Sequence, residues 1–158
     1  MRKFFLLLIF CGNYAFAQNA IVEESVTEVE CESNTHMTTH YKEMTTILNE
    51  QGASLAGFVC SCGKKDKLTS FKGQVTDETG KVIRKIKESD LEHTEYSRYL
   101  AVDDYKVYFD YTPPVYPVTI TYEWTIDSRD DLITFPCFCP QTDYDVSVRK
   151  ATYSLKAP

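Results

Sequence analysis

The 158-residue sequence contains little glycine, few histidines and no block of basic residues. Its six glycines are scattered, so it lacks the glycine-rich loop that cradles phosphate groups in nucleotide-binding proteins. Its formal charge at pH 7 is −6, and an acidic chain without a basic segment lacks the electrostatic surface that binds nucleic acid. Eleven tyrosines and nine phenylalanines indicate strands around a packed core, and not a disordered chain.

Long hydrophobic runs are also missing, apart from one at the N-terminus. Residues 1–3 (MRK) are followed by the apolar residues 4–10, and residues 15–17 (AFA) place small side chains where signal peptidase cleaves. This pattern predicts a signal peptide over residues 1–17 and export to the periplasm or out of the cell. An apolar run this short falls far below the ~20 residues that span a bilayer, so a membrane anchor is the weaker alternative. Lipoprotein processing at Cys11 is a second alternative, disfavoured by the bulky preceding side chain. We expect no membrane span in the remaining chain.

The remaining chain is dominated by a periodicity of two. Apolar and polar residues alternate over residues 118–127 and over residues 105–111, which places the apolar side chains of each strand on one face. Thr121 and Glu123 are predicted to lie on the opposite face. The predicted core residues of these two strands are Trp124, Ile120, Val107 and Phe109.

Turn residues separate the other predicted strands. The prolines of residues 112–117 predict a loop, and residues 77–80 (DETG) predict the turn of a hairpin over residues 67–87. Ser89 and Glu92 resemble the start of one short helical turn. Further strand-like segments are residues 22–33, 38–49 and 54–62, and a last strand from Tyr144 with a bulge near residues 149–150. Without repeats or linkers, residues 18–158 are predicted to form a single all-β domain, an antiparallel β-sandwich of about eight strands.

Five cysteines remain after the predicted signal peptide, and four of them form two Cys-x-Cys pairs. In a strand both sulfurs of such a pair point to one face, and a disulfide between the pairs is geometrically easier than one within a pair. An odd number leaves at least one thiol unpaired. The cysteines can be interpreted as small buried hydrophobic residues, as a disulfide, or as part of a metal site that includes His36 and His40. The spacing disfavours the metal site, because the cysteines of structural zinc sites are usually two to four residues apart. The cysteines are Cys31, Cys60, Cys62, Cys137 and Cys139.

No group of residues forms a recognisable catalytic motif. A cysteine nucleophile needs an exposed, activated thiolate beside a positioned base, and none of the three histidines (His93 is the third) has that context. Acidic residues near strand ends could act in acid–base catalysis or bind calcium, but turn chemistry accounts for them equally well. Tyrosines between residues 96 and 111 could bind a carbohydrate or peptide, although packing explains them too. We therefore assign no catalytic, cofactor or metal residues.

Several segments together resemble a known family. They are residues 29–33 (VECES), 41–49 (YKEMTTILN), 70–73 (SFKG), 77–91 (DETGKVIRKIKESDL), 116–123 (YPVTITYE) and 140–148 (PQTDYDVSV). Their order and spacing are similar to the uncharacterised domain that precedes transglutaminase-like domains in exported bacterial proteins, and the match covers about residues 20–158. The resemblance implies a β-sandwich without assigned catalytic residues.

The resemblance also has consequences for function. Family members usually continue into a Cys-His-Asp domain, whereas this sequence ends at Pro158, so no catalytic residue is carried over. We expect a non-enzymatic exported module that needs no cofactor and binds a protein, peptide or glycan. The alternative is an accessory domain of a transglutaminase-like or protease-like enzyme. The sequence identifies neither the ligand nor the oligomeric state.

Overall fold

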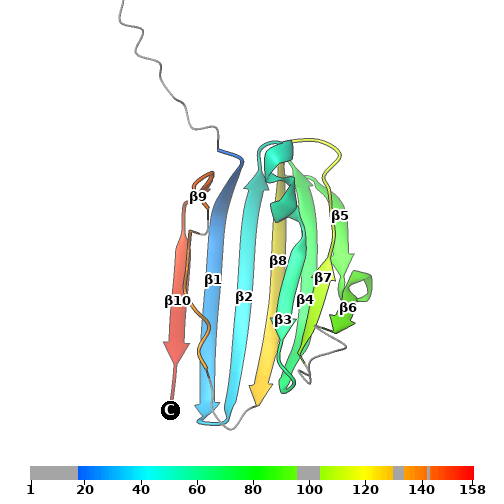
Figure 1. Cartoon of the computed structure of the whole chain (residues 1–158). Helices are drawn as coiled ribbons and strands as arrows, with labels where there is room; N and C mark the ends of the chain where they lie inside the picture. The colour runs from blue at the N-terminus through cyan, green and yellow to red at the C-terminus, as the bar shows by residue number, and fades with distance from the viewer. Residues whose placement is uncertain (1–17, 96–103, 130–133, 142) are drawn as a thin grey trace, which may run out of the picture.

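A computed structural model describes residues 18–95, 104–129, 134–141 and 143–158 of the chain (Figure 1). The predicted signal peptide lies outside these residues. Strands make up most of the described chain and helices only a small part, which confirms the all-β prediction. None of the helices described is long or apolar enough to cross a membrane.

The strands form two sheets of unequal size. In the large sheet the order is β10-β1-β2-β8-β4-β5, with β9 also paired to β1, and in the small sheet it is β3-β7-β6. The large sheet contains β1 (Ala20–Ser33), β2 (His36–Ile47), β4 (Asp66–Asp77), β5 (Val82–Lys87), β8 (Val118–Arg129), β9 (Val146–Val148) and β10 (Ala151–Lys156). The small sheet contains β3 (Phe58–Cys62), β6 (Glu92–Glu95) and β7 (Tyr105–Phe109), and two short 3-10 helices are η1 (Glu50–Ala56) and η2 (Glu88–Asp90).

The large sheet is mixed and not purely antiparallel. The long strands β1, β2, β8, β4 and β5 pair antiparallel, whereas β9 and β10 both run parallel to β1. Alternation reveals a strand but not the direction of its neighbour, so the parallel pairs have no signal in the sequence. Backbone hydrogen bonds from Arg149 to Val22 and from Ser25 to Lys150 join β1 to the irregular step between β9 and β10, where the sequence predicted a bulge.

The core lies between the two sheets, where β3 and β7 cover the inner face of β8 and β4 (Figure 1). Ile120, Val107 and Phe109 are buried as predicted. The prediction for Trp124 was half right: its ring faces the core but is only partly buried, stacked on Tyr41 at a centroid distance of 4.9 Å. It lies at the margin of the region that the small sheet covers, which is why its burial is incomplete.

Several predicted boundaries shift in the structure. Residues 54–56 belong to η1, because the Asn49 side chain accepts a hydrogen bond from the Gly52 amide and starts a helical turn there. The hairpin of β4 and β5 is confirmed, and Gly80 takes the left-handed conformation (φ 83°). The predicted helical turn is η2, which begins after Lys87 and not at Ser89. Residues 134–141 are not a strand, and Tyr144 lies before β9 and is exposed.

Candidate functional site

A β-bulge turns two consecutive glutamates of β1 toward the outer face of the large sheet, away from the small sheet. The register of β1 against β2 shifts between Val22 and Glu24. As a result Glu23 contacts Thr46 and Glu24 contacts Lys42, although neighbouring residues of a regular strand point to opposite faces. Beyond the bulge, alternate residues of β1 continue to face outward.

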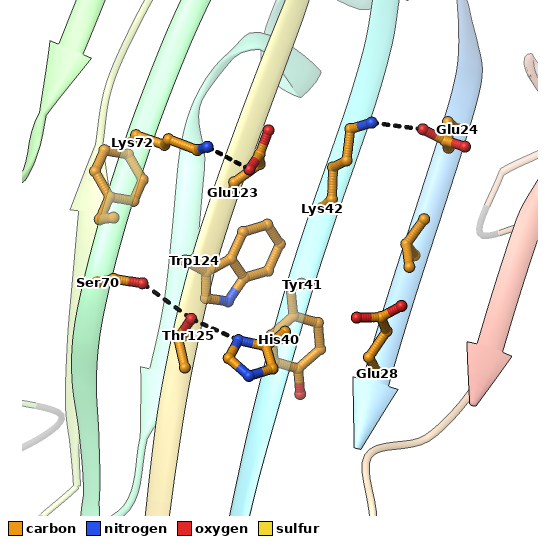
Figure 2. A pocket seen from close by; sticks show the side chains of 12 residues that line it. Glu24, Glu28, His40, Tyr41, Lys42, Ser70, Lys72, Glu123, Trp124 and Thr125 are labelled. Carbon is orange, nitrogen blue, oxygen red and sulfur yellow. Dashed lines mark hydrogen bonds and ion pairs between the residues drawn. The ribbon is translucent and has the colours of Figure 1, made fainter. Parts of the chain in front are cut away.

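A shallow groove of about 800 Å³ crosses this outer face (Figure 2). It runs over β1, β2, β8 and β4, so its floor is a rigid four-stranded ladder. Tyr41, Phe71 and Trp124 border it but pack toward the core, and charged, hydroxyl and imidazole side chains form most of its polar surface. These outward-facing residues are Glu24, Val26, Glu28, His40, Lys42, Ser70, Lys72, Glu123 and Thr125.

Ion pairs order the upper part of the groove. Lys42 Nζ donates to Glu24 Oε2 at 2.6 Å, and Lys150 Nζ donates to Glu24 Oε1 at 2.7 Å. Hydrogen bonds from Lys150 and Lys42 lower the pKa of Glu24 to about 2, so its carboxylate is charged at physiological pH. On the other side Lys72 lies 2.6 Å from Glu123, across the β4–β8 ladder (Figure 2). The groove therefore presents fixed charges of both signs.

A row of neutral polar groups lies beside these ion pairs. Ser70 Oγ donates to Thr125 Oγ1 at 2.9 Å, and the same oxygen lies 2.9 Å from His40 Nδ1 (Figure 2). Glu28 is the cross-strand neighbour of His40. The strands β4, β8, β2 and β1 thus each contribute one side chain at the same level of the sheet. This row offers hydrogen-bond donors and acceptors to a ligand lying across the strands.

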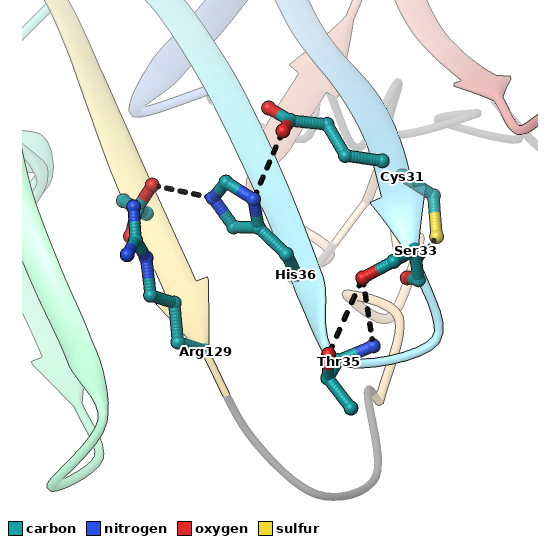
Figure 3. Close-up of polar contacts among 7 residues, drawn as sticks. Cys31, Ser33, Thr35, His36 and Arg129 are labelled. Atoms are coloured by element: carbon teal, nitrogen blue, oxygen red, sulfur yellow. Dashed lines mark hydrogen bonds and ion pairs between the residues drawn. The ribbon is translucent and has the colours of Figure 1, made fainter.

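His36 forms a separate cluster at the end of the β1–β2 hairpin (Figure 3). Its Nδ1 lies 2.9 Å from Glu32 and its Nε2 lies 2.8 Å from Asp127. The hydrogen bond to His36, and then that to Arg129, hold the pKa of Asp127 below its usual range. Carboxylates thus contact both ring nitrogens of His36. His36 and His40 lie on the same face of β2, and their partners on β8 are Asp127 and Thr125, not the cysteines.

The two Cys-x-Cys pairs lie in different environments. Cys60 and Cys62 are buried in the core with their sulfurs 3.7 Å apart, and their hydrogen bond, together with burial, raises the pKa of the Cys60 thiol. Cys137 and Cys139 are exposed and outside any strand, which corrects the prediction that they share a strand face. All five described cysteines are free thiols, and the described residues contain no group of three metal-ligating side chains.

The described tyrosines between residues 104 and 111 and the third histidine have structural partners. The Tyr105 hydroxyl donates to the Asp66 carbonyl, the Tyr108 hydroxyl donates to Glu92, and Tyr111 stacks on Phe109. His93 stacks on Tyr105 in the small sheet. These contacts are consistent with packing as the role of the described rings. Residues 96–103 and 130–133, which include further tyrosine and aspartate candidates, lie outside the described residues.

The sequence of residues 33–158 matches a domain of unknown function with a solved structure, DUF3857. The chain belongs to the DUF3857 family. This match covers most of the chain and agrees with the predicted resemblance to an uncharacterised domain. A search of curated proteins finds no match.

The solved structures that are similar to this chain have low sequence identity to it. A "putative protease" from Parabacteroides distasonis is similar with a TM-score of 0.57 and 10% identity, over 72% of this DUF3857 chain and 24% of that protein. An M1 zinc metallopeptidase from Deinococcus radiodurans gives a TM-score of 0.33 and 7% identity over 71% and 21% of the two chains. A mutant of that metallopeptidase gives a TM-score of 0.33 and 9% identity, over 70% of this chain and 21% of the mutant chain. The DUF3857 chain thus spans about a quarter of the length of these proteins.

The sequence pattern does not reveal the residues that build the groove. Alternation placed Glu123 on the outer face, and its contact with Lys72 is consistent with that prediction. However, the pattern gave no means of knowing that β1, β2, β8 and β4 lie side by side. The bulge at Glu23–Glu24 had a weak signal, two adjacent acids within a predicted strand.

Proposed function

We propose that this DUF3857 protein is an exported, non-catalytic module that binds an extended segment of a protein or peptide in the groove on its outer face. The groove carries this proposal: it is an open, rigid, four-strand surface of about 800 Å³ with ordered charges of both signs. An extended peptide supplies both amide donors and carbonyl acceptors along its length, and it matches a surface that alternates carboxylate, ammonium, hydroxyl and imidazole groups. The outward-facing residues of the groove include no aromatic ring on which a sugar would stack.

Features of the same surface support a non-catalytic role. The distance between His40 and Thr125 suits a base and a nucleophile, but catalysis also needs donors that stabilise an oxyanion. Thr125 lies on β8, which is paired on both sides, so the ladders to β2 and β4 use the backbone amides around it. Buried Cys60 and Cys62 are likewise poorly placed to attack a substrate.

An accessory role in a longer protease-like or transglutaminase-like enzyme is the second candidate. The similarity to one quarter of the Parabacteroides distasonis protein favours it, because the fold there is one part of a longer chain. In that case the groove would bind another domain or an enzyme substrate. The groove side chains that contact it would be the same as those proposed above to bind a peptide.

Site-specific crosslinking tests the groove as a binding surface. A photoreactive phenylalanine analogue at Thr125 would be compared with one at Glu78, an exposed turn residue on β4–β5. We expect a discrete crosslinked protein or peptide from position 125 in the native envelope fraction, absent from position 78 and lost after charge reversal of Lys42 and Lys72. Equal products from both positions would contradict the proposal.

Turnover assays test the non-catalytic role separately. The purified protein and a variant with every cysteine changed to serine are incubated with peptide, amide and amine-acceptor substrates. We expect background rates in both. Turnover above background in the unaltered protein would disprove this part of the proposal, and its loss in the cysteine-free variant would identify a thiol nucleophile.

A further inference from the structure

A second hollow lies on the inner face of the large sheet, beside the free edge of β3. It has a volume of about 200 Å³, enough for one long side chain but small for a typical small-molecule pocket. Phe58, Tyr122 and Trp124 contribute aromatic surface to its wall, and Glu43 lines it from β2. We name this hollow the β3 cleft. Glu43 and Glu123 lie on opposite faces of the sheet, so the β3 cleft is distinct from the groove.

Glu43 differs from most other glutamates of the large sheet. Among the described residues, its hydrogen-bond partner is the Thr45 hydroxyl, at 3.2 Å. Its side chain remains solvent-accessible, yet loss of hydration among the surrounding protein atoms raises its pKa. By contrast, four glutamates that contact a lysine or arginine are Glu23, Glu24, Glu30 and Glu123. Glu43 is thus an accessible carboxylate that contacts no lysine or arginine among the described residues.

The wall beside Glu43 suits the remainder of a basic side chain. Phe58 meets the Trp124 ring edge-on, with centroids 5.2 Å apart, and the partly buried Trp124 ring is held in place by Tyr41. Aromatic surface of this kind packs against the aliphatic stem of lysine or arginine and attracts the charged group. Glu43 would then accept charge-assisted hydrogen bonds from the ammonium or guanidinium group.

The rim of the β3 cleft presents an unpaired strand edge. β3 pairs with β7 on one side, and the sheet order β3-β7-β6 leaves its other side without a described partner strand. Figure 1 shows this free side facing the part of the large sheet that includes β2. Val59 on β3 is 63% exposed and Leu55 of η1 is 40% exposed at the same rim. A free edge with apolar neighbours is a template for an added strand.

We propose that the β3 cleft receives an arginine or lysine side chain from an extended segment of a protein partner, and that this segment pairs with the free edge of β3. The charge of Glu43 selects a basic side chain, the aromatic wall holds its stem, and the strand edge aligns the backbone. The acidic charge of the whole chain, −6, favours the approach of such a segment.

Titration with blocked tripeptides tests the proposal on the full chain. The probes are acetyl-Val-X-Val-amide with X as arginine, lysine or the neutral analogue citrulline. Trp124 is the single tryptophan of the chain and lines the cleft, so its fluorescence reports binding. We expect saturable binding of the arginine and lysine peptides, and about tenfold or more weaker binding of the citrulline peptide, as the loss of a charged hydrogen bond predicts. NMR amide shifts at Val59 and Ser61 should accompany binding.

Two matched variants separate the charge of the cleft from a general charge effect. Glu43→Gln should weaken binding of the arginine peptide about tenfold or more, whereas Glu78→Gln, at the exposed β4–β5 turn, should leave its affinity unchanged. Equal affinity for arginine and citrulline, an unaffected Glu43→Gln variant, or amide shifts confined to the outer face would each overturn the proposal. Self-association that Glu43→Gln abolishes would assign the cleft to a second copy of the chain and also overturn it. The crosslink at position 125 tests the groove alone, so failure of the cleft proposal leaves the groove proposal unaffected, and the reverse also holds.

Discussion

The buried hydroxyl of Tyr122 gives a direct test of how the two layers are joined. It donates a 2.8 Å hydrogen bond to the carbonyl of Ala56, which is fully buried at the junction of η1 and β3. In Tyr122→Phe the ring contacts with Phe58 and Phe71 remain, but the carbonyl loses its donor. A neutral hydrogen bond contributes about 0.5–1.5 kcal/mol, and a buried group left unpaired costs about 1–3 kcal/mol, so we expect a loss of about 1–2 kcal/mol. Urea unfolding at pH 7, followed by Trp124 fluorescence, measures this difference.

The same substitution has a predicted pH dependence. Burial raises the pKa of Tyr122 above its usual range. The stability contributed by its neutral form is therefore present below about pH 10, the unfolded value, and is lost as the pH rises toward the folded pKa. The difference between the unaltered protein and Tyr122→Phe should shrink above pH 10. As a control, Tyr108→Phe, whose exposed hydroxyl contacts Glu92, should change stability at pH 7 by less than about 0.5 kcal/mol. A loss below that value for Tyr122→Phe would refute the role of the hydrogen bond.

Three further predictions concern the sheet and the thiols. The melting temperature of Glu24→Gln should be lower than that of the unaltered protein at pH 7. This difference should vanish as the pH falls from about 4.5 to about 2, because the lysine partners lower the folded pKa of Glu24 to about 2. An unchanged difference at low pH would contradict this. Gly73→Ala should destabilise by about 1–3 kcal/mol in urea unfolding, since the added methyl group would lie 2.9 Å from the Tyr122 ring; a neutral effect would show that the ring moves aside freely. A maleimide should label the exposed Cys137 and Cys139 of the native protein, while Cys60 and Cys62 should react only after denaturation; rapid native labelling of all four would refute the burial of the second pair.

The sequence was sufficient for features that depend on local pattern. The alternation of β8 identified Ile120 as core and Glu123 as an outer-face residue, and the contact environments of both are consistent with this. Gly80 marked the β4–β5 turn correctly because the left-handed conformation found there strongly favours glycine. The partial burial of Trp124 could not be predicted, since it depends on where the edge of the small sheet falls.

The candidate sites depend on contacts between residues distant in the chain. Glu24 and Lys150 are 126 residues apart, and they meet only because the last strands return parallel to β1. Alternation places Glu43 on the face of Tyr41 and Thr45, but its lack of a basic partner becomes visible only in the folded sheet. Composition and periodicity carry no information on such pairings.

The parallel pairing of β1 and β10 has a mechanical consequence. The first and last strands lie side by side in six matched residue pairs, from Ser25–Ala151 to Glu30–Lys156, and the chain leaves them at opposite ends of the sheet (Figure 1). Tension applied to the two ends would therefore slide the strands along each other, and the hydrogen bonds between them would share the load at once. In an antiparallel pair pulled from one end, the hydrogen bonds would instead break one after another. We therefore expect the β1–β10 pair to resist a pull along the strands better than such an antiparallel pair would.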